Sequence, residues 1–264
     1  MKMKQNEILN KIITDRTSGS SEILTKLNKF LLSNIKEKGL IIESLSAART
    51  KLSHFAVIKN YIDELNMLLA SDNYERFIEY VRNNEEEDKL IIKEIFKNIY
   101  KKLPSAKTIL TISKSGTLIN VIKLWHKKRT NLNIIITESR PANEGKLMAK
   151  ELLMCGLKVE MITDVMTGIF VPKADAVIVG ADVVLNNGNV INKTGSLTLA
   201  LLCKHYKKPF YVLASKSKFV SENRHKINEE DSDNIWKYVH PNLTTTNIPF
   251  EEINKGLITE IISE

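Results

Sequence analysis

The sequence has few cysteines, little glycine in its first hundred or so residues, and no long hydrophobic run. Its 264 residues include two cysteines, Cys155 and Cys203, and neither has a second cysteine or a histidine at the spacing of metal ligands. A disulfide-rich fold and a cysteine-based metal centre are therefore excluded. Both cysteines fall inside predicted helices among apolar neighbours, so we expect two reduced thiols buried in the core.

No apolar stretch approaches the roughly 20 residues that a membrane span needs. The N-terminal segment Met-Lys-Met-Lys-Gln-Asn-Glu also lacks the hydrophobic region of a signal peptide. With 43% hydrophobic and 27% charged residues, the composition is that of a globular protein and not of a disordered one. We therefore expect a cytoplasmic location.

The formal net charge of +8 raises the question of nucleic-acid binding, because clustered Lys and Arg neutralise phosphates. The basic clusters are small, however, and lie at 101–102, 127–129 and 204–208. All three fall at the ends of predicted helices, where the helix dipole alone favours cations. Acidic residues are interleaved elsewhere, so the pattern favours a solvated Lys-rich surface over a nucleic-acid groove.

The first part of the chain, residues 1–103, has almost no glycine, and its apolar residues recur at spacings of three and four. This periodicity predicts an all-helical N-terminal domain. Gly39 is expected to end a helix, and Ser71-Asp72 to begin a later one. The helices are predicted at residues 4–14, 21–38, 42–49, 53–69, 72–83 and 86–102.

After Pro104 the pattern changes to strands that alternate with helices, which indicates a parallel sheet with helices on both faces over residues 104–264. The fold class predicted is thus α/β, with a helical domain first. Strands are predicted at 108–112, 133–137, 157–162, 176–179, 190–191 and 209–213. Helices are predicted at 116–128, 143–155, 164–170 and 195–206.

Small, hydroxyl-bearing or charged residues follow several of these strands, and the carboxyl ends of parallel strands form the edge where ligands bind. Ser113 to Thr117 lead into a helix, whose N-terminal N–H groups suit an anion; the alternative is an N-cap in a tight turn. The segment does not have the spacing of a P-loop. In Glu138-Ser139-Arg140-Pro141, Arg140 is suited to a phosphate or carboxylate, or else to an internal pair with Glu138 or another acid.

Two further strand ends and a lysine complete this set. Gly180-Ala181-Asp182 places a carboxylate where it acts as an acid or base, or merely caps a turn. Asn192 to Ser196 give a second helix N-terminus with Lys193 beside it, and Lys218 follows the last strong strand. Their convergence indicates a pocket for a polyanionic small molecule.

These motifs, in this order and spacing, resemble the initiation factor 2B alpha/beta/delta family, in an archaeal-type member. That family also contains methylthioribose-1-phosphate isomerase and ribose-1,5-bisphosphate isomerase. The strong resemblance covers residues 105–220, with a weaker echo of the family's C-terminal strand at 258–260. It implies a Rossmann-like second domain related to the ribose-5-phosphate isomerase and CoA-transferase folds, dimerisation through that domain, and hexamers in some members.

The resemblance also assigns residues. The family's enzymes use a Cys and an Asp; Asp182 matches the Asp, whereas Ser113 stands in place of the Cys. The first-loop arginine of the isomerases is displaced here to Arg16, so its phosphate contact does not carry over. The resemblance implies no cofactor and no metal. The ligand contacts that it and the strand ends suggest are Gly19, Arg49, Ser115, Gly116, Thr117, Glu138, Arg140, Gly180, Asn192, Lys193 and Lys218.

The serine at position 113 separates two hypotheses. A thiol is readily tuned for proton transfer, whereas a serine hydroxyl needs a neighbouring base, and no histidine adjoins Ser113. We therefore favour a non-catalytic regulatory subunit like those of initiation factor 2B, which binds a protein partner such as initiation factor 2 and has room for a sugar phosphate or nucleotide as an additional ligand. The alternative is an aldose–ketose isomerase of sugar phosphates that relies on Asp182. An unrelated ligand-binding role is the third hypothesis.

Overall fold

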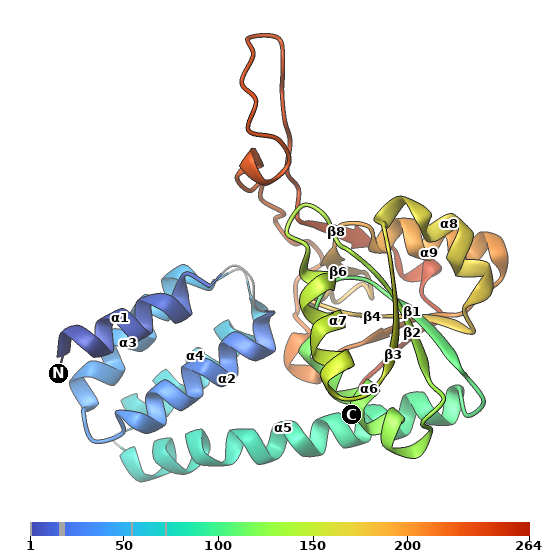
Figure 1. Cartoon of the computed structure of the whole chain (residues 1–264). Coiled ribbons are helices and arrows are strands. Elements are labelled where there is room, and N and C mark those ends of the chain that lie inside the picture. The colour runs from blue at the N-terminus through green and yellow to red at the C-terminus, as the bar shows by residue number, and fades with distance from the viewer. Residues whose placement is uncertain (1, 16–18, 54, 72) are drawn as a thin grey trace. The chain divides into compact units, whose positions relative to one another are not determined.

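The computed structural model describes residues 2–15, 19–53, 55–71 and 73–264, and the chain divides into two compact units, Met1–Ile92 and Lys93–Glu264 (Figure 1). None of the helices in the described ranges has the length and hydrophobicity that a membrane crossing requires.

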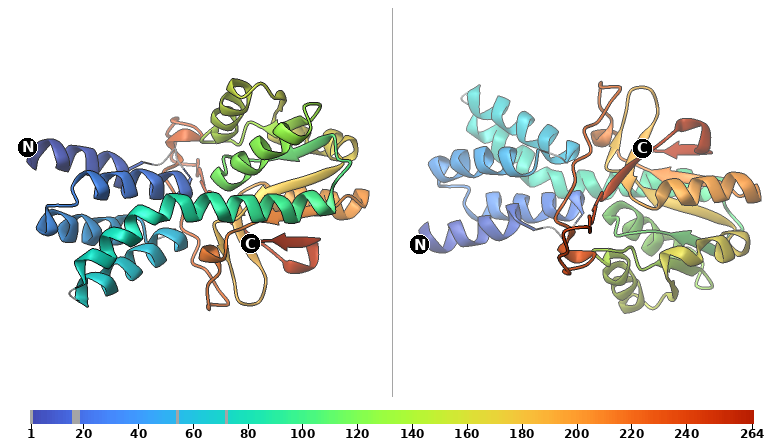
Figure 2. Two further views of the ribbon diagram at one scale, coloured as in Figure 1. Left: turned by 90° about the horizontal axis from the view of Figure 1, so that it is seen from below. Right: turned by 90° about the horizontal axis from the view of Figure 1, so that it is seen from above.

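The first unit is helical. It contains α1 (Lys2–Ile13), α2 (Ser20–Ser33), α3 (Lys38–Lys51), α4 (Ala56–Ala70) and the first part of α5 (Tyr74–Lys102). The helices α1 to α4 pack side by side around leucine, isoleucine and phenylalanine side chains (Figure 2). Inside this core Asn28 donates to the carbonyl of Val81 at 3.0 Å and accepts from the Tyr61 hydroxyl, which ties α2, α4 and α5 together.

The predictions of helices over 21–38, 72–83 and 86–102, and of Gly39 as a helix end, are wrong. The helix expected over 21–38 ends at Ser33, because the Asn34 side chain donates to the Phe30 carbonyl at 2.7 Å and turns the chain. Gly39 does not end a helix but lies in the first turn of α3.

The helices expected over 72–83 and 86–102 are one continuous helix, α5. It begins at Tyr74, where Asn73 caps it by accepting from the N–H of Arg76 at 3.1 Å. Of the expected start at Ser71-Asp72, Ser71 instead caps α4, and Asp72 lies outside the described residues. Lys89 pairs with Glu85, which lies in the expected break, at 3.5 Å, and with Glu86, directly after the break, at 2.7 Å.

The second unit is built on a parallel six-stranded sheet with strand order β3-β2-β1-β4-β7-β9. A second, antiparallel sheet has the order β5-β6-β8. The strands of the large sheet are β1 (Thr108–Thr111), β2 (Asn133–Thr137), β3 (Lys158–Ile162), β4 (Ala176–Gly180), β7 (Phe210–Leu213) and β9 (Glu260–Ile262). Those of the small sheet are β5 (Val183–Val184), β6 (Val190–Lys193) and β8 (Phe250–Ile253).

Helices cover both faces of the large sheet, as the sequence predicts. Figure 1 shows α6 (Gly116–Lys128) and α7 (Glu144–Met154) on one side, and α8 (Thr167–Phe170) and α9 (Ser196–Tyr206) on the other. Short 3₁₀ turns lie at Asp164–Met166, Val171–Lys173, Lys216–Lys218, Ser232–Asn234 and Lys255–Leu257.

The expected domain boundary at 103/104 marks where helices give way to strands, whereas the compact units divide earlier, inside α5. The last turns of α5 pack on the second unit: the rings of Phe96 and Tyr100 meet the buried Trp125 edge-on, with centroids 6.3 and 5.7 Å apart. Asn98 donates to the carbonyl of Ser263 at 2.8 Å. Aromatic packing therefore assigns the end of the long helix to the sheet that follows.

The two cysteines differ. Cys203 in α9 is buried, as expected, whereas Cys155 is exposed, and the prediction of a core position for it is wrong. Cys155 is the C-cap that follows the last residue of α7, Met154, so it lies beyond the buried face of the helix.

Residues 221–249 form an extended arm that projects from the second unit, drawn in orange to red in Figure 1. Its base is closed by the N–H of Glu230, which donates to the carbonyl of Asn247 at 2.9 Å, and by the Asn247 amide, which donates to the Asp231 carbonyl at 2.8 Å. Beyond this base the side chains of Trp236 and Tyr238 are stacked on each other and more than half exposed.

Candidate functional site

Ser113 follows β1 at the edge of the large sheet and turns the chain sharply. It has φ +62°, in the left-handed region that residues other than glycine rarely adopt. Its N–H donates to Ser139 Oγ at 2.7 Å, and Ser139, which follows β2, has the same φ. Ser113 Oγ donates to Glu144 Oε2 at 3.3 Å. The left-handed turns after β1 and β2 are thus joined by a hydrogen bond between Ser113 and Ser139.

Glu144 also pairs with Lys193, and this ion pair is largely buried. Lys193 Nζ lies 2.8 Å from Glu144 Oε1, and the two side chains are 8% and 15% exposed. The ammonium also lies over the ring of Phe250, 5.5 Å from its centroid. Glu144 therefore connects the serine in the cysteine position with the lysine expected to hold a ligand.

The helix N-terminus after Lys193 holds a carboxylate of the protein itself. The N–H groups of Gly195 and Leu197 donate to Glu251 Oε1 at 2.7 and 2.8 Å. Asn192, predicted to contact a ligand, donates to Ser196 Oγ at 2.9 Å. The anion expected at the start of α9 is thus supplied by Glu251 from β8.

The first predicted helix N-terminus is capped by Ser115, whose Oγ accepts from the N–H of Leu118 at 3.3 Å. A Cβ on Gly180, at the end of β4, would lie 2.5 Å from that oxygen. Gly180 is therefore required to let β4 approach the start of α6. Gly116 and Thr117 form the first turn of that helix, and Thr117 is buried.

Arg140 is exposed, and its side chain pairs with neither Glu138 nor any other acid that the structure describes. Its guanidinium donates to the carbonyl of Asn234 at 2.9 Å, and so contacts the arm. Glu138 instead pairs with Lys146 at 3.5 Å. The backbone N–H groups of Ser139 and Arg140 donate to the carboxylate of Asp164 at 2.9 and 2.8 Å, which fixes this turn.

Asp182 and Lys218 lie close together at the strand ends. Asp182 is half-buried, and its N–H donates to the Ile191 carbonyl at 2.9 Å. Lys218 is buried and donates to the carbonyl of Ala181. Burial lowers the pKa of Lys218, and the negative charge of Asp182 partly opposes that shift.

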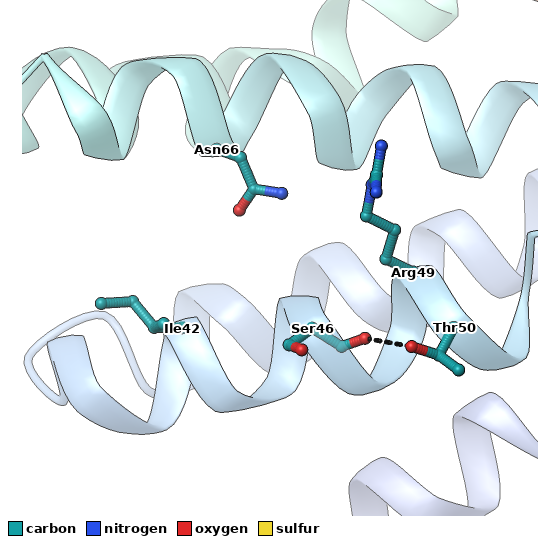
Figure 3. Close-up of a pocket in the computed structure, with 5 residues that line it drawn as sticks. All are labelled: Ile42, Ser46, Arg49, Thr50 and Asn66. Atoms are coloured by element: carbon teal, nitrogen blue, oxygen red, sulfur yellow. Dashed lines mark hydrogen bonds between the residues drawn. The ribbon is translucent and has the colours of Figure 1, made fainter.

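Two of the predicted ligand residues belong to the first unit. Gly19 is the N-cap of α2, and Arg16 lies outside the described residues. Arg49 lines a shallow groove of about 320 Å³ between α3 and α4, where Figure 3 shows it rising from α3 toward the helix of Asn66. Its Nε donates to Asp63 at 2.7 Å, in a half-exposed ion pair.

The sequence of the whole chain, residues 1–264, matches the Initiation factor 2 subunit family. This chain belongs to that family. A translation initiation factor eIF-2B subunit 2-like protein of Pyrococcus abyssi is 30% identical over 97% of this chain and 94% of its own length. A ribose 1,5-bisphosphate isomerase of Methanocaldococcus jannaschii is 32% identical over 70% of this chain and 58% of its own length.

Solved structures of family members share the fold. The translation initiation factor eIF-2B of Pyrococcus horikoshii superposes with a TM-score of 0.81 at 26% identity, covering 98% of this chain and 94% of that one. The 5-methylthioribose 1-phosphate isomerase of the same organism gives 0.84 at 19% identity, covering 98% and 82%. The family and fold expected from the motifs are therefore confirmed. The relatives include proteins named as initiation factors and proteins named as sugar-phosphate isomerases.

Sequence reasoning missed three acidic residues at the candidate site, Glu144, Asp164 and Glu251. Each contacts a group that is far away in the sequence, and the shortest of these separations is 24 residues, between Arg140 and Asp164. Glu144 alone carried a local signal, since an acid at the start of a helix after a strand end faces the ligand edge. In the described residues, no three His, Cys, Asp or Glu side chains gather as a metal site requires.

Proposed function

We propose that this protein is a non-catalytic, initiation factor 2B-like regulatory subunit that binds a protein partner and retains a small-molecule pocket at the strand ends. Ser113 and the Glu144 carboxylate, to which its hydroxyl donates, carry this proposal. To act in isomerisation the hydroxyl would need a base. The Glu144 carboxylate that the hydroxyl contacts is already engaged by the Lys193 ammonium, 2.8 Å away, and no histidine adjoins Ser113 in the sequence.

The arm supports the protein-partner part of the proposal. Trp236, Tyr238 and Val239 are 57%, 53% and 90% exposed, although such side chains are normally removed from water. Exposed apolar clusters that include Trp and Tyr are typical of protein–protein interfaces. The partner proposed is initiation factor 2 or a related protein, and the protein itself is proposed to be a dimer or larger homo-oligomer.

The catalytic part is tested by incubating the protein with ribose 1,5-bisphosphate and following ribulose 1,5-bisphosphate. We expect no turnover from the wild type. Turnover that Asp182→Asn abolishes would refute the regulatory proposal. A Ser113→Cys variant is the matched control, because it restores the thiol of the family's enzymes without changing the rest of the site.

The partner part is tested separately, with Trp236→Ala/Tyr238→Ala. Because both side chains are exposed, the double variant should unfold at the wild-type temperature. It should also lose binding to immobilised initiation factor 2, or shift to a smaller species in sedimentation. Unchanged binding and unchanged size together would remove the arm from the proposal.

One observation favours the alternative, a sugar-phosphate isomerase. Asp182 lies beside the buried Lys218, whose lowered pKa is typical of functional lysines. In this alternative Asp182 carries the proton between two oxygens of the substrate, and some group other than a thiol acts at carbon.

A further inference from the structure

The ion pair between Glu144 and Lys193 has a consequence for any ligand. Lys193 is the last residue of β6 in the small sheet, and Glu144 is the first residue of α7, which covers the large sheet. The pair therefore links the small sheet to a helix of the large sheet, at the place of the proposed pocket. With 8% and 15% of their side chains exposed, the two groups leave little room for a second anion at Lys193.

We infer that Glu144 is a built-in competitor for the anionic group of a ligand: its carboxylate occupies the position on Lys193 that a phosphate or carboxylate group would take. This inference rests on the proposed pocket, but not on the protein-partner role or on the absence of turnover. It makes Glu144 a specificity-determining residue, since it discriminates among ligands before any chemistry.

The backbone next to Glu144 is closely packed against the end of β2, so the side chain is the part with room to move away from Lys193. A Cβ on the neighbouring Gly145 would lie 1.8 Å from the carbonyl oxygen of Thr137, which shows how closely α7 begins against the end of β2. The Glu144 side chain is held less tightly at Oε2 than at Oε1. Its contact with Ser113 Oγ is 3.3 Å, at the long end for a hydrogen bond between oxygens.

The electrostatic effect follows from the balance of charges. An ammonium with low exposure attracts an anion strongly, whereas an ammonium already 2.8 Å from a carboxylate presents a nearly neutral pair. An incoming anion must therefore displace Glu144 and give up part of its own binding energy. Small inorganic anions have no other contacts to offset that loss, whereas a larger organic phosphate does, so the pocket rejects the former.

The test uses the full-length protein and inorganic phosphate as the probe, with binding measured by titration calorimetry and by the rise in unfolding temperature. Glu144→Gln should bind phosphate at least about tenfold more tightly than the wild type, which corresponds to about 1.4 kcal/mol. The double variant Glu144→Gln/Lys193→Gln should lose that gain. The matched control is Glu151→Gln, which removes a carboxylate from the same helix that pairs with Lys123 at 2.7 Å.

The inference is overturned if Glu144→Gln binds phosphate no better than the wild type, if the gain survives loss of Lys193, or if Glu151→Gln gains as much. Glu144→Gln leaves a buried ammonium unpaired and can fail to fold. In that case, recovery of the native tryptophan fluorescence on adding phosphate, but not chloride at equal ionic strength, is the expected result. No recovery overturns the inference. The phosphate-binding results do not depend on the isomerase assay or on the partner-binding assay, so a failure of the proposed function in those assays can be told apart from a failure of this inference.

Discussion

Gly145 gives the sharpest structural prediction, because it decides where α7 begins. A Cβ at this position would lie 1.8 Å from the carbonyl oxygen of Thr137 and 3.1 Å from the carbonyl carbon of Glu138. Both are backbone atoms, so no side-chain rotation relieves the contact. We predict that Gly145→Ala strongly destabilises the second unit.

The size of the effect follows from the displacement. The start of α7 must move by more than an ångström before the Cβ contact reaches 3.0 Å, below which such contacts are essentially never seen. Forcing extra atoms into a packed core costs typically about 1–3 kcal/mol, and shifting Glu144 also weakens its buried pair with Lys193. We expect a total loss of about 2–4 kcal/mol. For a unit of this size each kcal/mol corresponds to about 2–4 °C in the unfolding temperature.

The assay is urea or thermal unfolding followed by tryptophan fluorescence. The two tryptophans, Trp125 and Trp236, both lie in the second unit, so the signal does not include the helical unit. Gly168→Ala in α8 is the matched control, since a Cβ there meets nothing within 4 Å. That variant should be unchanged or more stable by up to about 1 kcal/mol. A Gly145→Ala protein as stable as the control would refute the reasoning.

Five strands of the large sheet, β1 to β4 and β7, could be predicted because each carries a pattern in its own residues, whereas β9 was expected only from the family resemblance. Residues 133–137 form a strand and 116–128 a helix, as their patterns indicate. The small sheet could not be predicted, because β5 has two residues and β8 pairs with β6 from the far side of the arm. Such pairing has no local signal. In α5, charge pairs on a solvated surface continue the helix where hydrophobic periodicity indicated two.

The sequence predicts which residues of the candidate site lie at the ends of strands, but not which side chains they contact. The serine turns and the lysine at the end of β6 lie where the pattern put them. Their partners do not follow from sequence, since Glu144 lies 31 residues from Ser113 and 49 from Lys193, and the contacts form only when the layers pack. The exact end of a helix is also hard to predict from sequence. The helix predicted to end at Cys155 ends at Met154, and Cys155 is exposed.

Three further results are expected. Glu251→Gln removes the charge that two N–H groups at the start of α9 share, and should cost about 1–2 kcal/mol in urea unfolding; a loss below about 0.3 kcal/mol would contradict this. Burial raises the pKa of the Cys203 thiol to about 12, so a disulfide reagent should modify Cys155 alone until urea is added, and prompt reaction of both thiols would be inconsistent with the fold. Burial, followed by the charges of two neighbouring glutamates, raises the pKa of Asp88 to about 6 from 3.8, so its contribution to stability is complete below about pH 4 and is lost as the pH rises through 6. Asp88→Asn, which stays neutral, should therefore stabilise the helical unit by about 1–2 kcal/mol at pH 7.5 and by nothing at pH 4, as followed by far-UV circular dichroism, and an equal effect at both pH values would show that the carboxylate is not desolvated.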